Sequence, residues 1–202
     1  MKGSHRQLLA FAQANGLIRS RDLNNLGVPR TALAEMLELG CLVKITRGLY
    51  TLPEHTISEH QTLSEISYKY PNTIICLLSA LRFHNLTTQS PPDVWVAIPN
   101  KSRAPKIDYP PLRVVWFSGL ALQEGIEKYN ISGINIQITN IPRTVMDCFK
   151  YRNKIGLDVA IEALNESWCQ HLVNMDDLWL YANLLRVANV TRPYLDQLVY
   201  RN

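Results

Sequence analysis

The chain has 202 residues, of which 47% are hydrophobic and 19% are charged. This balance is typical of a folded protein with a sizeable core and excludes an intrinsically disordered chain. Residues 1–55 hold seven Lys or Arg residues against four acids, whereas the rest of the chain holds 14 against 13, so the net charge of +4 is concentrated at the N-terminal end. A basic excess in one small region fits nucleic-acid contact.

Targeting segments and cysteine motifs do not stand out in the sequence. No apolar run approaches the roughly 18 residues of a membrane span, and the first residues lack the apolar core of a secretory signal. We therefore expect a cytoplasmic protein with no membrane partner. The four cysteines, Cys41, Cys76, Cys148 and Cys169, are far apart and form no CxxC motif, so we expect reduced, mostly packed thiols.

The N-terminal region predicts three helices in succession. The apolar spacing in residues 5–14 predicts the first, which should end at Asn15-Gly16. The second, over 21–27, should be capped by Ser20. The third should start at Pro29, a residue favoured at the first helical position, and end at Gly40.

A change of period follows these helices. The runs "CLVKI" and "GLYTL" read as short strands, and "TRG" between them supplies the glycine of a tight hairpin. Three helices closed by a hairpin in about 50 residues is the plan of a winged helix-turn-helix, in which the third helix enters the DNA major groove. We therefore predict a winged helix-turn-helix domain over residues 1–54.

This plan assigns candidate DNA contacts to the third helix. Its buried stripe leaves Arg30, Thr31, Ala34 and Glu35 on the outer face. Arg30 is the best candidate because arginine can bond guanine bidentately, and Thr31 can bond a base or touch a thymine methyl. Glu38 should lie away from the DNA, since a carboxylate repels phosphate.

The hairpin assigns a second set of contacts. Lys44, Thr46 and Arg47 on the wing should meet phosphates or enter a minor groove, which gives salt-dependent affinity rather than sequence choice. A winged helix can also serve as a protein-interaction or dimerisation module, with these side chains merely solvated. Both interpretations stand at this point.

Residues 56–202 predict a second domain of mixed α and β structure whose last third is helical. After a helix through 59–70 capped by Ser58, the strand-like segments are 73–78, 93–98, 112–118 and 134–139. The helix-like segments are 79–85, 143–152, 157–170, 175–188 and 192–200, with breaks at Gly156, Asn174 and Thr191. The predicted fold class is α+β, a winged helix-turn-helix followed by a mixed domain.

Two charged segments of the second domain invite a functional interpretation. The loop with Lys101, Arg103 and Lys106 is either a second phosphate contact or an ordinary solvated loop. In the helix that starts near Arg143, the side chains of Arg143, Asp147 and Lys150 are three or four residues apart and can form an ion pair, or else contribute to a binding face.

Motifs for catalysis are missing from the sequence. The nine glycines are scattered, with no GxxxxGK and no GxGxxG, and the segment of His55 and His60 offers too few ligands for a catalytic metal. No lysine is preceded at two residues by the acid that is common in nuclease sites. We predict no enzyme activity, no cofactor and no metal; a cryptic metal-dependent nuclease is the remaining enzyme hypothesis.

The motifs together resemble those of the AbiEi family of antitoxins and transcriptional regulators, from type IV toxin-antitoxin systems of bacterial abortive infection. The N-terminal likeness lies in "GLIRSRDLNNLGVPRTALAEMLELGCLVKITRGLYTLP". Further likeness lies in "LLSALRFHNLTTQSPPDVWVAIP", "ITNIPRTVMDCFKYRNKIGLDVAIEALNE" and "YANLLRVANVTRPYLDQL", so that it covers nearly the whole chain.

This resemblance implies functions that the residue patterns alone do not give. It implies a winged helix that binds operator repeats in double-stranded DNA and represses its own operon, with the DNA face around Arg30, Thr31, Lys44 and Arg47. It also implies an antitoxin domain over 56–202 that counters a nucleotidyltransferase-like toxin without a stable complex. Whether the protein is a monomer or a homodimer, and whether it is a solitary regulator, stays open.

Overall fold

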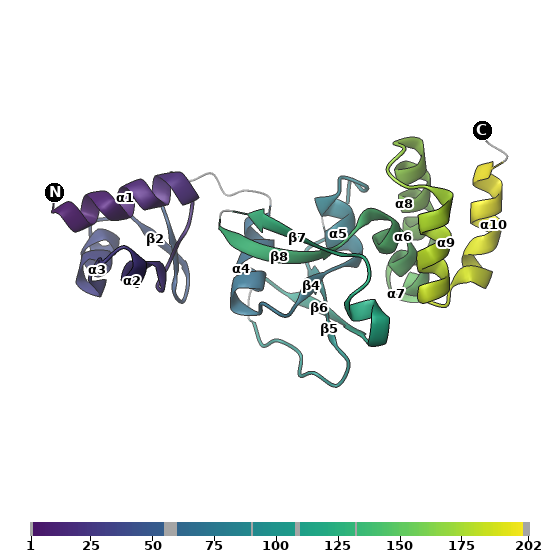
Figure 1. The fold of residues 1–202 in the computed structure, drawn as a ribbon, viewed down its shortest axis with the longest axis horizontal. Coiled ribbons are helices and arrows are strands. Elements are labelled where there is room, and N and C mark those ends of the chain that lie inside the picture. Colours follow the sequence, from purple (N-terminus) through teal and green to yellow (C-terminus); the bar gives the residue numbers. More distant parts are fainter. Residues whose placement is uncertain (1, 55–59, 90, 108–109, 132, 200–202) are drawn as a thin grey trace. The chain divides into compact units, whose positions relative to one another are not determined.

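The computed structural model describes residues 2–54, 60–89, 91–107, 110–131 and 133–199. The chain divides into two compact units, Met1–Lys69 with Asn130–Asn135, and Tyr70–Tyr129 with Ile136–Asn202. Figure 1 shows the elements of each unit. In the part of the chain that is described, no helix has the length and apolar character needed to cross a membrane.

The first unit contains three short helices and a small antiparallel sheet, followed by a further helix. Its elements are α1 (Gly3–Asn15), β1 (Ile18–Arg19), α2 (Asp22–Asn25), α3 (Arg30–Glu38), β2 (Val43–Thr46), β3 (Leu49–Thr51) and α4 (Gln61–Lys69). The sheet has the order β1-β3-β2, in which the predicted hairpin is β2-β3 and the unpredicted strand β1 pairs with the other side of β3. The predicted winged helix-turn-helix is confirmed.

The apolar stripes of α1 and α3 form the core of this unit. Leu8 and Ala12 from α1 pack in one buried cluster with Leu33 and Met36 from α3. Gly16 ends α1 with a φ of 74°, a left-handed conformation that glycine adopts without strain. The core therefore fixes which side of α3 faces outward.

The predicted cap of the second helix is wrong. The helix α2 starts at Asp22, and the Ser20 side chain makes no cap hydrogen bond to it. The carboxylate of Asp22 instead accepts from the backbone N–H of Arg19 at 2.8 Å and from Arg19 Nε at 3.0 Å. A charged acceptor forms the stronger bonds in this tight turn.

The second unit is built on a mixed sheet of five strands in the order β6-β5-β4-β8-β7. Its elements are β4 (Ile74–Ile75), α5 (Leu77–Phe83), β5 (Val94–Pro99), β6 (Leu112–Phe117), η1 (Gly119–Leu122), β7 (Ile126–Ile131) and β8 (Ile134–Thr139). The strand predicted over 73–78 is only partly right, because Leu77, with a φ of 50°, turns the chain into α5. Strand β7 was not predicted, because its apolar residues do not alternate regularly with its polar ones.

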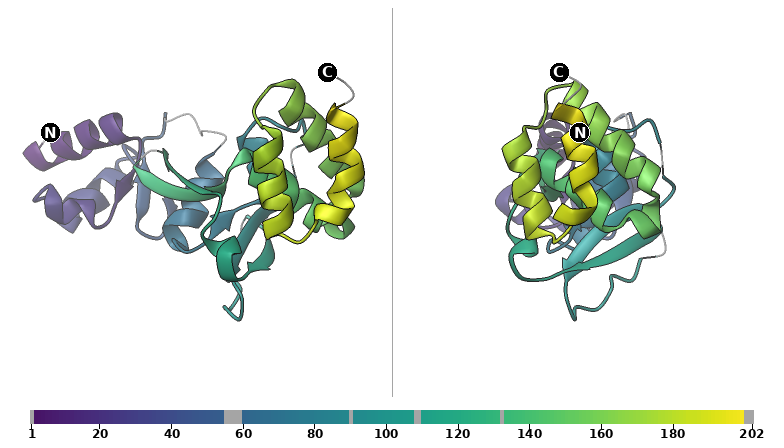
Figure 2. Two further views of the ribbon diagram at one scale, coloured as in Figure 1. Left: turned by 45° about the vertical axis from the view of Figure 1, so that its right-hand side comes forward. Right: turned by 90° about the vertical axis from the view of Figure 1, so that its right-hand side faces the viewer.

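The C-terminal third is helical, as predicted. It consists of α6 (Ile141–Lys150), α7 (Arg152–Ile155), α8 (Leu157–Cys169), α9 (Met175–Leu184) and α10 (Ala188–Val199). Both α8 and α9 pack against α6, and Figures 1 and 2 show α10 beside α9. Asn174 caps α9 by accepting from the N–H of Asp177 at 2.8 Å. The break expected at Thr191 is wrong: the buried Thr191 lies inside α10, and the chain turns at Arg186, with a φ of 60°.

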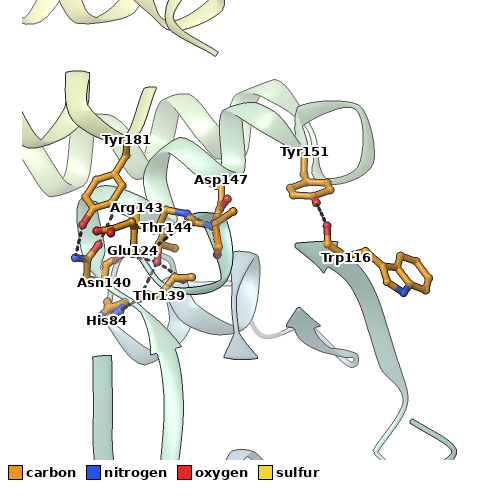
Figure 3. A network of polar contacts seen from close by, with 11 residues as sticks. His84, Trp116, Glu124, Thr139, Asn140, Arg143, Thr144, Asp147, Tyr151 and Tyr181 are labelled. Atoms are coloured by element: carbon orange, nitrogen blue, oxygen red, sulfur yellow. Dashed lines mark hydrogen bonds and ion pairs between the residues drawn. The ribbon is translucent and has the colours of Figure 1, made fainter. Parts of the chain in front are cut away.

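A fully buried ion pair lies within α6, and its arginine also bonds the segment before β7. Arg143 Nε donates to Asp147 Oδ2 at 2.9 Å, and both side chains have 0% exposure. The same guanidinium donates to the carbonyl of Glu124 at 2.8 Å (Figure 3). It also donates to the carbonyl of Ala121 at 3.2 Å and lies over the ring of Phe117. The predicted ion pair is confirmed, and its burial excludes Arg143 and Asp147 from a solvent-accessible binding face.

Polar groups around α6 extend this network. Asn140 caps α6 by accepting from the N–H of Arg143, and its amide donates to the Tyr181 hydroxyl of α9 at 3.1 Å. The Thr144 hydroxyl donates to the Thr139 carbonyl at 3.0 Å. Gly125 is required beside this network, because a Cβ there would lie 2.8 Å from the Tyr181 ring. The sheet, α6 and α9 are thus held by shared contacts.

Replacing Arg143 with Met should lower the free energy of unfolding by about 3–5 kcal/mol, because Asp147 and two carbonyls would lose their buried donor. Urea denaturation measures this difference. The matched control is Lys150→Met on the exposed side of the same helix, which should change stability by no more than about 0.5 kcal/mol. Equal effects of the two variants would contradict the importance of the pair.

Stability should also depend on the protonation of Asp147. Burial raises the pKa of this carboxyl from 3.8 to about 6, against the opposing effect of Arg143. Between these pH values the folded protein holds a proton that the unfolded chain has released, so the free energy of unfolding should fall as pH rises through this window. In Asp147→Asn this side chain no longer titrates. Denaturation at several pH values should therefore show a smaller decline in the free energy of unfolding. Parallel profiles for the two proteins would contradict the shifted pKa.

Candidate nucleic-acid interface

The outer face of α3 carries the residues that the sequence proposed for base contact. At 100° per residue the buried Ala32, Leu33 and Met36 define one side of the helix. Arg30 and Thr31 are exposed at its N-terminal end. The first turn of α3 therefore presents a guanidinium and a hydroxyl to solvent, which is the geometry a recognition helix needs.

Glu35, on the same helix, is held by α1. Lys2 Nζ lies 3.0 Å from both Glu35 carboxylate oxygens, and the buried His5 contributes Nε2 at 2.9 Å from Oε2. The hydrogen bond from Lys2 lowers the pKa of Glu35, so its charge is balanced locally. This acid therefore opposes a nearby phosphate less than an unpaired one would. Glu38 is exposed on the last turn of α3, away from Arg30.

The turn of the wing is anchored through Gly48 and exposed at Arg47. The Gly48 carbonyl accepts from the N–H of Ser20 at 2.9 Å and from the Tyr68 hydroxyl at 3.1 Å. Gly48 has a φ of 82°, which a residue with a Cβ rarely adopts. Arg47, next to it, is exposed at the turn. The bonds to Gly48 thus hold the backbone next to Arg47 in place, while the Arg47 side chain is free to contact DNA.

Lys44 and Thr46 differ in their positions on the wing. Lys44 is exposed and lies directly opposite Tyr50 in the β2-β3 ladder, so both side chains are on one face of the sheet. Thr46 is half-buried after an irregularity in the ladder between Lys44 and Thr46. Lys44 is therefore better exposed than Thr46 for contact with a phosphate.

A hollow of about 300 Å³ lies between α3 and the face of the sheet that carries Tyr50. Its lining consists of Ser20, Leu23, Arg30, Leu33, Ala34, Leu37 and Tyr50. Ser20 and Tyr50 add hydroxyl groups that the sequence did not single out for DNA contact. The position of Tyr50 follows from its register with Lys44, which only the folded sheet shows, and no sequence signal existed for Ser20 beyond its expected role as a cap. Together with Arg30 they offer hydrogen-bond donors suited to a phosphate, above an apolar floor.

The charged loop of the second unit is a separate candidate. Lys101, Arg103 and Lys106 are all exposed. The loop backbone is held by the Trp116 indole, which donates to the Ser102 carbonyl at 3.3 Å, and by the Tyr70 hydroxyl, which donates to that of Lys106. The three charges are available to solvent, as both interpretations of this loop require.

No constellation for catalysis was identified among the described residues. There, no three His, Cys, Asp or Glu side chains are grouped as metal ligands. His84 is bonded through Nε2 to the Thr139 carbonyl at 2.7 Å, which is a structural contact. Cys76 and Cys148 are buried free thiols whose pKa values are raised by desolvation, so neither is an activated nucleophile. His55 lies outside the described residues.

Comparison with solved structures supports the fold. The crystal structure of the RV2827C protein from Mycobacterium tuberculosis is similar, with a TM-score of 0.61 and 13% sequence identity over 91% of this chain and 72% of that chain. At this identity the likeness concerns the fold alone. No curated protein matches the sequence.

Comparison with protein families bears on the winged helix. Residues 6–53 match the family described as "Transcriptional regulator, AbiEi antitoxin". The match runs from α1 to the end of the wing and includes Arg30, Lys44 and Arg47. The resemblance to the AbiEi family of antitoxin transcriptional regulators is therefore confirmed over residues 6–53, which contain the winged helix-turn-helix.

Proposed function

We propose that this protein is a DNA-binding transcriptional autorepressor and the antitoxin of a type IV toxin-antitoxin system. The observation that carries the proposal is the exposure of Arg30, Lys44 and Arg47 on a winged helix that matches a family of antitoxin regulators. In this role the protein acts without a cofactor and without catalysing a reaction. Its partners are operator repeats upstream of its own operon and, functionally, a nucleotidyltransferase-like toxin that forms no stable complex with it.

The DNA contacts divide by chemistry. The N-terminal end of α3 enters the major groove, where Arg30 bonds guanine and Thr31 contacts a base or a phosphate. Lys44, Thr46 and Arg47 bind the flanking backbone or enter the minor groove. The loop with Lys101, Arg103 and Lys106 is a second phosphate contact. Repression then follows from occupancy of the operator.

A protein-interaction role for the winged helix is the second candidate. It is favoured by two large apolar side chains that are exposed on this unit, Leu39 at 68% and Val43 at 46%. In that case the winged helix would bind a partner protein and the second unit would mask a toxin directly. Retention of the neighbouring gene product through high-salt washes would support this role over operator binding. Magnesium-dependent cleavage of plasmid DNA would instead indicate a nuclease.

Substitution of the proposed contacts should weaken binding to the upstream DNA in a gel-shift titration. Arg30→Ala should cost about 1–3 kcal/mol and relax the preference for one base pair, because a bidentate contact is lost. Arg47→Ala and Lys44→Ala should weaken binding to all sequences alike. Lys128→Ala, an exposed cation on β7, is the control and should bind as the wild type does. Undiminished binding by both Arg30→Ala and Arg47→Ala would remove this face as the DNA site.

Affinity should fall steeply with salt, since each neutralised phosphate contributes about 0.9 to the slope of log K against log salt concentration. Arg47→Ala should reduce the slope by about 1, whereas Glu38→Gln should leave it unchanged. Fluorescence anisotropy of labelled operator DNA at several salt concentrations measures both slopes. An affinity that is insensitive to salt would count against phosphate contact altogether.

A further inference from the structure

A groove of about 700 Å³ opens in the second unit, and none of its described lining residues is among those proposed for DNA binding. Its lining is Leu78, Gln89, Pro91, Pro92, Asp93, Trp95, Arg113, Val114 and Lys154. The apolar members come from α5, the following loop and the sheet, and the charged members stand at its rim. It therefore combines an apolar floor with fixed charges, as peptide-binding grooves do.

The groove lies beside an edge of the sheet. Strand β6 is terminal in the order β6-β5-β4-β8-β7, and no described strand pairs with its outer side. The Pro111 and Phe117 carbonyls accept from β5, at Val94 N and Asn100 N. Because groups alternate along a parallel ladder, the N–H and C=O groups of Leu112, Val114 and Trp116 point to the outer side.

One end of this edge is already occupied. The Tyr151 hydroxyl donates to the Trp116 carbonyl at 3.3 Å, and Figure 3 shows the tyrosine beside the end of β6. This contact also confirms that the Trp116 carbonyl is directed away from β5. The backbone groups of Leu112 and Val114 remain available, next to the groove.

The charges at the rim favour an anionic partner. Asp93, whose side chain is 21% exposed, is bound by Arg113 Nε at 2.7 Å, while the Arg113 side chain is 64% exposed. Lys154 is exposed and has no acidic partner within ion-pair distance among the described residues. The described lining of the groove thus has one positive charge in excess, that of Lys154, whose Nζ lies over the ring of Tyr151.

We propose that this groove binds an extended acidic segment of a partner protein, which adds a strand to the outer edge of β6. Side chains alternate along a strand, so acidic residues on one face meet Arg113 and Lys154. The β-branched apolar residues between them lie on the other face, with Leu112 and Val114. Main-chain hydrogen bonds supply affinity, and the alternation supplies specificity. The proposal does not depend on DNA binding.

The test uses the full chain and a fluorescein-labelled peptide of sequence Glu-Val-Glu-Val-Glu-Val with blocked ends, which has the length of the six-residue strand β6. Fluorescence anisotropy should show saturable binding that weakens with salt. Lys154→Glu should weaken binding about tenfold by placing a like charge at the rim. Lys128→Glu, on the opposite edge strand, is the matched control and should bind the peptide as the wild type does.

A second variant tests strand addition itself. Val114→Pro removes an outward-facing N–H, which an edge strand tolerates, and should abolish peptide binding while circular dichroism shows an intact fold. A peptide with Lys in place of Glu should not bind. Equal peptide affinity for the wild type and Lys154→Glu would overturn the proposal. Displacement of the peptide by inorganic phosphate at equal concentration would also overturn it, by indicating a small-anion site.

Discussion

The packing of the second unit depends on the buried guanidinium of Arg143. A charge with no exposure to water is stable only if its donors are matched, and here they are matched by Asp147 and by two carbonyls before β7. These bonds fix the segment after β6 against α6. Tyr151 follows α6 directly and bonds the end of β6. The position of α6 therefore decides which part of the β6 edge is closed and which part stays open beside the groove.

A different constraint governs the winged helix. Helix α3 spans only nine residues, and its buried side leaves few positions for DNA. Two of the outward positions carry acids, which would oppose phosphate if both charges were free. The contact of Glu35 with Lys2 and His5 balances one of them and ties α1 to α3. The same contact holds α3 against the N-terminal end of α1, so an acid near the proposed DNA-binding face has a structural role.

Local patterns predicted the elements whose residues carry their own signal. The periodicity of α1 and α3, the glycine of the hairpin and the break at Asn174 needed no tertiary information. Strand β1 and the Lys2–Glu35 contact depend on residues about 30 positions apart in the chain, so no local pattern could indicate them. Thr191 looked like a helix start because threonine caps helices, yet its hydroxyl bonds carbonyls of its own turn. For the same reason the register that sets Tyr50 beside Lys44 became evident only from the folded sheet.

Under the proposed function, the small charge of the winged helix would limit how the protein selects an operator. Of its seven cations, Arg19 is paired with Asp22 and Lys2 with Glu35, which leaves few for phosphates. One or two base contacts from α3, each worth about 1–3 kcal/mol, cannot distinguish one site within a genome. Two copies of the protein bound to adjacent DNA repeats can distinguish such a site, because linked binding events combine their selectivities. Under the proposed function, the operator repeats that the AbiEi resemblance implies would therefore suit a small, weakly charged DNA-binding domain.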